Sequence, residues 1–191
     1  MFLPLLFLFL TPVSLSIPPA PPLVIITVPN GATRGCWGNM ELCPPGYVAK
    51  GFSLKKQLQQ MNGDDSAVNG LRLFCRPRNE NTPQTSITSS EGPFGISTIP
   101  IFCSDGHLVS FSMKVQSLAI ASSDHTAVNN FKFRCSNNLQ LEGDGLLWGS
   151  YGAWSASCPL GICGLQLRVE ENQFGADDTA LNNARFQCCV N

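Results

Sequence analysis

Carboxylates in three copies of one short motif are the first candidates for chemistry in this chain. The motif spans residues 63–69, 123–129 and 176–182, and it ends each time in Ala, a branched apolar residue and Asn. Its weak catalytic candidates are Asp64, Asp65, Asp124, Asp177 and Asp178. Glycosyl transfer needs two carboxyl groups placed on either side of the bond that breaks. Neighbouring aspartates lack that separation, so a catalytic pair would combine carboxylates from different copies.

Turn chemistry explains the same residue types without catalysis, and we prefer that interpretation. Asp and Asn side chains hydrogen-bond nearby backbone N–H groups in turns. The motif asparagines, Asn69, Asn129 and Asn182, are expected in buried turns for the same reason. The spacing matches no calcium-binding loop, and we predict neither a metal site nor a cofactor.

Aromatic residues are the weak candidates for ligand binding, because their rings can stack on sugars. Trp148, Tyr151 and Trp154 all belong to the third copy, while Trp37 and Phe94 stand at the start of the first two. In a small β domain most such rings pack against the protein. Packing is therefore the preferred interpretation, with the third copy as the binding candidate.

The elements around these residues repeat with them. Each copy begins with an aromatic residue followed by Gly (Trp37-Gly38, Phe94-Gly95 and Trp148-Gly149). An alternating run follows at 51–55, 110–114 and 164–168, and a second one ends at Cys75, Cys135 and Cys188. Alternation predicts strands with one buried face. Three like units predict an all-β protein with sheets around a shared axis, and a propeller is the alternative.

The segments between the copies are expected to be loops. Residues 77–93 are rich in Ser, Thr and Asn and are predicted to form an exposed loop, and 138–145 joins the second copy to the third. The β-branched run 24–28 predicts a first strand.

The amino-acid composition limits the classes of protein to which the chain can belong. The 191 residues include 9 Cys, 17 Gly and 14 Pro, with 13% charged residues and a net charge of −1. This balance does not suit a nucleic-acid-binding protein and is typical of a secreted, disulfide-bonded chain. The apolar N-terminus predicts a signal peptide at 1–16, because its run is shorter than the ~20 residues of a membrane span. Residues 17–191 are then one domain, with repeats at about 24–75, 92–135 and 146–189.

The cysteines predict a disulfide framework. Cys43 with Cys75 and Cys103 with Cys135 are both separated by 32 residues at equivalent positions. Cys158 and Cys163 face the adjacent Cys188 and Cys189; spacing nominates Cys188 for Cys158, but the order stays open. Cys36 has no counterpart, so it is either a free thiol or an intermolecular bridge. Zinc is disfavoured by the spacing and by the oxidising compartment.

Several of these segments resemble the vitelline membrane outer layer protein I family. The resemblance rests on residues 51–55, 63–69, 148–155, 177–183 and 188–189. It implies a β-prism of three Greek-key sheets with four disulfides, in a secreted protein of the outer egg envelope or another extracellular fluid. It also implies transglycosylation of N-acetylglucosamine oligosaccharides and a likeness to sugar-binding lectins, which membership alone does not guarantee.

The function expected from these observations is a secreted, disulfide-stabilised structural protein of the vitelline membrane outer layer or another extracellular matrix. Its expected partners are matrix or egg-envelope glycoproteins, without nucleic acid and without a membrane span. The alternative is a carbohydrate-active or lectin-like protein that acts on N-acetylglucosamine oligosaccharides, with a hexosaminyl transferase-like activity if it is an enzyme.

Overall fold

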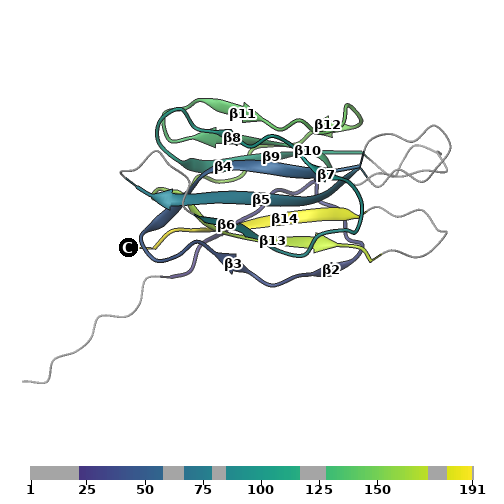
Figure 1. Ribbon diagram of the computed structural model, residues 1–191, viewed down its shortest axis with the longest axis horizontal. Helices are drawn as coiled ribbons and strands as arrows, with labels where there is room; N and C mark the ends of the chain where they lie inside the picture. Colours follow the sequence, from purple (N-terminus) through teal and green to yellow (C-terminus); the bar gives the residue numbers. More distant parts are fainter. Residues whose placement is uncertain (1–21, 58–66, 79–84, 117–127, 172–179, 191) are drawn as a thin grey trace, which may run out of the picture.

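Three antiparallel hairpins form the frame of the protein. The computed structural model describes residues 22–57, 67–78, 85–116, 128–171 and 180–190. The hairpins pair β4 (Tyr47–Lys56) with β5 (Val68–Pro77), β9 (Leu108–Val115) with β10 (Val128–Cys135), and β13 (Ile162–Val169) with β14 (Leu181–Cys188). All three correspond to the predicted alternating runs. The described residues contain no helix, and the antiparallel strands lie roughly along one common axis, horizontal in Figure 1.

Each hairpin is the centre of a Greek-key sheet. Sheet I has the order β6-β5-β4-β7 with β8 beside β4, sheet II the order β11-β10-β9-β12, and sheet III the order β1-β14-β13-β2 with β3 beside β13. In each sheet the fourth strand lies beside the first, which is Greek-key order. The added strands are β1 (Ile25–Ile26), β2 (Cys36–Trp37), β3 (Glu41–Leu42), β6 (Thr85–Thr88), β7 (Ile96–Ser97), β8 (Ile101–Phe102), β11 (Gln140–Glu142) and β12 (Ser150–Tyr151).

The sheets do not coincide with the copies of the sequence motif. The strands that open one copy pair with the hairpin of the preceding copy: β7 and β8 complete sheet I, and β12 completes sheet II. The N-terminal strands β1, β2 and β3 complete sheet III beside the C-terminal hairpin. The chain therefore closes on itself, and each sheet contains strands from two copies.

Two segments that were predicted to be loops contain strands. Within 77–93, β6 pairs with β5 through Leu73 and Ile87, and within 138–145, β11 pairs with β10 through Phe133 and Leu141. Ile87 and Leu141 both pack against the core. One inward apolar residue in a polar, four- or three-residue strand is too weak a pattern to predict from sequence.

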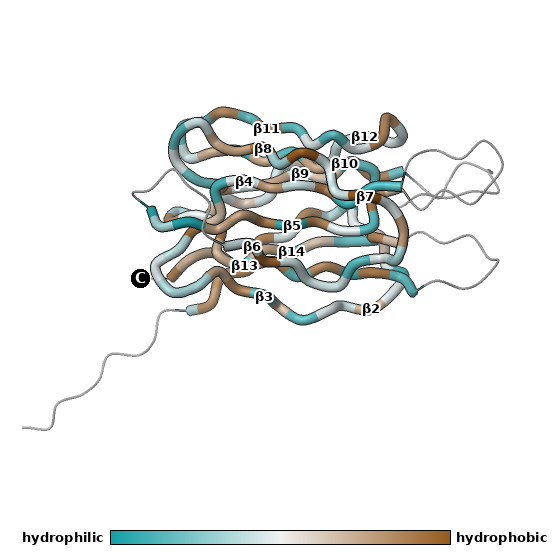
Figure 2. The backbone as a smooth tube through the Cα atoms, in the orientation of Figure 1, coloured by the Kyte–Doolittle hydropathy of each residue, from teal (hydrophilic) through white to brown (hydrophobic). Residues whose placement is uncertain are grey.

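Phenylalanines from all three sheets meet at the axis of the prism. Phe133 of sheet II lies 4.6 Å from Phe52 of sheet I and 5.3 Å from Phe186 of sheet III, measured between ring centroids. Phe111 closes the group at 4.5 Å from Phe186. These four rings are fully buried. Figure 2 shows apolar and polar residues alternating along the strands. Burial of such side chains contributes about 1.5–3 kcal/mol each.

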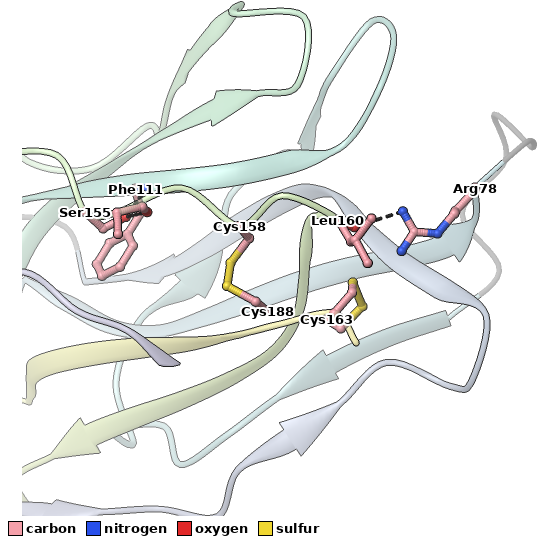
Figure 3. The surroundings of a disulfide bond; sticks show 9 residues. Arg78, Phe111, Ser155, Cys158, Leu160, Cys163 and Cys188 are labelled. Carbon is pink, nitrogen blue, oxygen red and sulfur yellow. Dashed lines mark hydrogen bonds between the residues drawn. A yellow bond between two sulfur atoms is a disulfide. The ribbon is translucent and has the colours of Figure 1, made fainter. Parts of the chain in front are cut away.

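Four disulfides close the end of the prism at which the first strand of each hairpin begins. They join Cys43 to Cys75, Cys103 to Cys135, Cys158 to Cys188 and Cys163 to Cys189. This resolves the order that the sequence left open for the last two bonds. Cys36 is the exposed free cysteine of the described chain. Figure 3 shows the bond between Cys158 and Cys188, with the guanidinium of Arg78 donating to the carbonyl of Leu160 nearby.

Candidate functional site

The five aspartates proposed as catalytic candidates, Asp64, Asp65, Asp124, Asp177 and Asp178, lie outside the described residues. The strand ends that flank them are described. Lys56 pairs with Val68, Val115 with Val128 and Val169 with Leu181, so all three hairpins turn at the same end of the prism. We call this the turn end; the disulfide end lies opposite.

The asparagines of the three motifs are buried at the turn end, as predicted, but each is the second residue of a strand (β5, β10 or β14) rather than part of a turn. Asn69, Asn129 and Asn182 are 0% exposed. Their backbone carbonyls accept hydrogen bonds from the N–H groups of Gly92, Leu146 and Ala32, at 2.7, 2.8 and 2.8 Å. Asn69 Oδ1 also accepts from the N–H of Phe94 at 3.2 Å. Each asparagine therefore fastens the segment that leads into the next copy, which is a structural role.

The glycine that opens the first copy is Gly35 rather than the predicted Gly38, while Gly95 and Gly149 open the other two as predicted. Gly35, Gly95 and Gly149 have φ of 76°, 88° and 77°, the left-handed region that only glycine enters freely. A Cβ at any of them would overlap the backbone carbonyl of Val169, Lys56 or Val115. Gly35, rather than Gly38, is thus the equivalent of the other two.

Aligning the three copies on Gly35, Gly95 and Gly149 changes which aromatic residues are equivalent. Each glycine is followed by a two-residue strand, so Trp37 of β2, Ser97 of β7 and Tyr151 of β12 occupy one position. They pair with Arg168, Lys55 and Lys114 respectively. The predicted equivalence of Trp37 with Trp148 is wrong, because Gly38, which follows Trp37, is not the glycine with positive φ that opens the first copy.

Cations cover the aromatic candidates on the outer faces of the sheets. Lys132 Nζ lies 4.1 Å from the ring centre of Tyr151, and the guanidinium carbon of Arg134 lies 4.5 Å from that of Trp154. Arg185 lies 4.4 Å from the ring of Trp37. At these distances the cation and the ring attract each other. This arrangement supports packing as the main role of these rings.

Tyr151 also joins the two outer strands of sheet II. Its hydroxyl donates to Glu142 Oε1 at 2.9 Å, and Glu142 Oε2 lies 3.3 Å from Lys132 Nζ. Burial, the hydrogen bond to Glu142 and the charge of that carboxylate raise the pKa of Tyr151. Its hydroxyl therefore stays protonated and acts as a donor.

Trp148 is separate from this cluster. It precedes Gly149 at the turn end and is 46% exposed, and Phe94, its equivalent in sheet I, is 37% exposed. The equivalent position of sheet III holds Arg34. The three ligand-binding candidates Trp148, Tyr151 and Trp154 therefore do not share one cation-covered surface.

A groove of about 420 Å³ at the turn end brings together carboxylates from different copies. It lies between the outer edge of sheet III and the segment that follows β6. Trp37 lines it together with Glu91, Glu170 and Glu171. Glu91 accepts from Thr88 Oγ1 at 3.0 Å and lies 4.0 Å from Lys55 Nζ. Sequence reasoning missed these glutamates because they lie outside the repeated motif.

A larger and more apolar groove, of about 910 Å³, lies at the disulfide end. Its lining includes Leu42, Pro44, Pro45, Tyr47, Leu160 and Val190, with Arg78 beside them. His107 stands near this end. Burial, and then the charges of Arg78 and Lys50, lower the pKa of His107.

The described part of the chain contains neither a metal-binding cluster nor a membrane-spanning helix. It holds no group of three or more His, Cys, Asp or Glu side chains arranged to bind a metal ion. Among the same residues, no helix has the length and apolar character to cross a membrane.

Comparison with known proteins places these features in context. A family model described as vitelline membrane outer layer protein I matches residues 24–191. The vitelline membrane outer layer protein 1 homolog of Mus musculus is 44% identical over 168 residues, which are 87% of this chain and 83% of that protein. The homolog of Homo sapiens is 43% identical over 167 residues, 86% of this chain and 82% of that protein.

Solved structures with little sequence similarity share the fold. Single-chain recombinant jacalin matches with a TM-score of 0.54 and 11% identity, covering 89% of this chain and 96% of that one. The Calsepa lectin, solved with a bisected glycan, matches with a TM-score of 0.54 and 14% identity, covering 91% of this chain and 100% of that one. A mannose-binding lectin from Champedak matches with a TM-score of 0.53 and 12% identity, covering 91% of this chain and 100% of that one. The predicted β-prism of three Greek-key sheets is thereby confirmed.

Proposed function

The chain belongs to the vitelline membrane outer layer protein I family, and on this premise we propose that it is a secreted, structural protein of an extracellular matrix. Its partners are the glycoproteins of an egg envelope or a comparable coat. Residues 1–16 act as the signal peptide, and residues 17–191 form the mature protein.

The observation that carries this proposal is the disulfide framework. Each of the three hairpins has a disulfide of its own at the same end, and a fourth joins Cys163 to Cys189. Disulfides persist in oxidising compartments, which supports secretion. Closing a loop of 32 residues removes unfolded-chain entropy worth about 3.7 kcal/mol. Several such bonds suit a protein that must last outside the cell.

Expression in secretory cells tests the first half of the proposal. The medium is expected to contain a protein that begins at Ile17 and carries four disulfides with one free thiol, as measured by intact mass before and after reduction. The second half is tested by retention of the purified protein on isolated egg-envelope glycoproteins. A protein that stays in the cytosol with reduced cysteines, or that washes off the glycoproteins like serum albumin, would contradict it.

The second candidate function is lectin-like or carbohydrate-active, directed at N-acetylglucosamine oligosaccharides. The turn-end groove supports it, because Glu91 and Glu170 come from different copies and stand with Trp37 around one hollow. An aromatic ring beside a few polar groups is typical of small-ligand sites. Transglycosylation would further require one carboxyl group to be protonated.

Incubation with N-acetylchitohexaose, followed by mass spectrometry, separates the two candidates. Both longer and shorter oligomers are expected from a transglycosylase, and Glu91→Gln should then abolish them while Glu142→Gln, on the outer face of sheet II, leaves them unchanged. An unchanged hexamer that still binds in a titration identifies a lectin. An unchanged and unbound hexamer leaves the structural function alone.

A further inference from the structure

All 12 Lys and Arg side chains of the protein belong to residues that the structure describes. Six of the 13 acidic residues lie outside the described ranges, namely Asp64, Asp65, Glu80, Asp124, Asp177 and Asp178. The remaining seven acidic residues share the described part of the chain with the 12 basic ones, so the partner of each cation there can be examined in turn.

The outer face of sheet II gathers three of these cations. Lys132 stands between Ser112 of β9 and Glu142 of β11, and Arg134 follows two residues later on the same face. Two residues along a strand correspond to about 7 Å. Lys114 of β9 pairs with Tyr151, and its Nζ lies 5.6 Å from the ring that Lys132 covers. We call Lys114, Lys132, Arg134, Tyr151 and Trp154 the basic face.

Two of the three cations of the basic face have no carboxylate partner among the described residues, whereas both lysines at the end of β4 in sheet I have one. In sheet I, Lys55 lies 4.0 Å from Glu91 and Lys56 lies 2.9 Å from Asp144. In sheet II, Glu142 is the carboxylate beside Lys132. Lys114 and Arg134 form no ion pair and donate no hydrogen bond within the described residues.

The cations of sheet III differ in another way, because their guanidinium groups are already engaged. Arg168 Nε donates to the carbonyl of Gly35 at 3.0 Å, and Arg185 Nε donates to Gln166 Oε1 at 2.6 Å. Of the three outer faces, that of sheet II thus keeps the most cationic donors available for a ligand.

The aromatic rings hold these cations in place. Lys132 and Arg134 lie against Tyr151 and Trp154, and Tyr151 is itself fixed by Glu142. A cation over a ring keeps its charge and the N–H donors that point away from the ring. Groups that are already ordered lose less entropy when a ligand binds. The cations of the basic face are therefore preorganised to bind an anion.

We propose that the basic face of sheet II binds a sulfated glycan chain. Each sulfate group is a negatively charged acceptor, and the Arg134 guanidinium can donate two parallel hydrogen bonds to such an oxyanion. Lys114 and Lys132 supply a second point of charge, so that a chain with regularly spaced sulfates is held at more than one place. The inference rests on the proposed association with extracellular glycoproteins and names the chemistry of the contact.

Binding of the mature, disulfide-bonded protein to immobilised chondroitin sulfate tests this inference, with chemically desulfated chondroitin as the reference surface. The variant Lys114→Gln/Lys132→Gln/Arg134→Gln removes the cations of the face. Arg72→Gln is the matched control, because Arg72 holds the place of Lys132 in sheet I, opposite Ser53 and Thr88. Lys114→Gln alone is included, since Lys114 Nζ lies 5.6 Å from the ring centre of Tyr151, farther than Lys132 Nζ at 4.1 Å, and its replacement should disturb the packing of the face least.

The expected result is binding to the sulfated surface that weakens as salt is raised and that falls about tenfold or more in the triple variant. Lys114→Gln should show a smaller loss, while Arg72→Gln binds like the parent. Absence of binding at physiological salt, equal binding to the desulfated surface, or an equal loss in Arg72→Gln would each overturn the inference. Retention on egg-envelope glycoproteins without binding to chondroitin sulfate would overturn it and leave the proposed function standing.

Discussion

Sheets I and II are built on the same hairpin and yet present different outer faces. Arg72 and Lys132 occupy equivalent places on β5 and β10. Beside Lys132 stand Glu142 and the ring of Tyr151. Beside Arg72, the corresponding strands supply Thr88 of β6 and, at the position of Tyr151, Ser97 of β7.

The inner faces of the two sheets are much more alike. Phe52 and Leu54 of β4 correspond to Phe111 and Met113 of β9, and all four are fully buried. The comparison teaches that the threefold arrangement constrains the residues that point toward the axis, because they must fill one shared core. Residues that point outward are constrained much less, so the chemistry of the molecule differs from sheet to sheet.

The largest expected effect is at the shared core. Phe133→Ala removes the ring that contacts both Phe52 and Phe186, and it is expected to lower the free energy of unfolding by about 3–5 kcal/mol. Leu73→Ala, its equivalent in sheet I, should cost about 2–5 kcal/mol. Denaturant unfolding with disulfides intact measures both. A loss below about 1 kcal/mol at either site would break the claim that inner faces are equally constrained.

The disulfides of sheets I and II are expected to contribute equally. Cys43–Cys75 and Cys103–Cys135 both close 32 residues, so replacing either pair with Ala should cost about 3.7 kcal/mol. Unfolding of the two double variants in the same denaturant gives the comparison. A difference above about 2 kcal/mol would show that the two disulfide ends are not equivalent.

A smaller effect is expected where the outer faces differ. Tyr151→Phe keeps the ring beneath Lys132 and removes the hydrogen bond to the half-exposed Glu142. The free energy of unfolding is expected to fall by about 1 kcal/mol, as measured by thermal or denaturant unfolding. Glu142→Gln is the companion variant and should cost a similar amount. If neither changes stability, the contact does not tie β12 to β11.

The reciprocal change tests whether sheet I can acquire the missing contact. Ser97→Tyr places a ring at the position of Tyr151, within reach of Arg72 across the sheet, and is expected to stabilise by about 0.5 kcal/mol. Ser97→Leu controls for apolar area alone. A tyrosine no better than the leucine would show that the cation does not use the ring.

The smallest effect concerns pH. His107 lies between Gly106 and the start of β9 at Leu108, and burial and the charges of Arg78 and Lys50 lower its pKa. The unfolded chain therefore binds the proton at higher pH than the folded one. Stability is retained above the ordinary pKa of about 6.5 and falls as pH decreases below it.

His107→Gln should flatten this part of the stability curve. Unfolding of the parent and the variant at pH values between about 7.5 and 5 isolates the contribution of His107 from that of other titrating groups. A parent curve that runs parallel to that of the variant would contradict the assignment.

Much of the fold was predictable because strong alternation and repeated cysteines report directly on strands and on the ends of hairpins. The runs around Phe52, Phe111 and Leu165 became β4, β9 and β13. The exchange of strands between copies was not predictable, since β2, β7 and β12 have two residues each. Strands so short have no period, and their partners are set by tertiary packing.

The site was less predictable than the fold. Glu91 and Glu170 approach one groove only because the segment after β6 packs beside the edge of sheet III, and no local pattern contains that information. The stacking of Lys132 on Tyr151 was missed for a related reason. It depends on the pairing of β12 with β9, and a strand of two residues has no alternation from which its partner and register could be predicted.

The closure of sheet III by β1, β2 and β3 has a consequence for the order of synthesis. These strands leave the ribosome first, yet their partners β13 and β14 leave it last. Until then Ile25 and Ile26 have no sheet to join, and an apolar strand with open hydrogen-bonding edges is prone to pair with other chains. Sheets I and II can assemble in order as they emerge. The final hairpin then pairs with the N-terminal strands, so the prism is complete only after β13 and β14 have been synthesised.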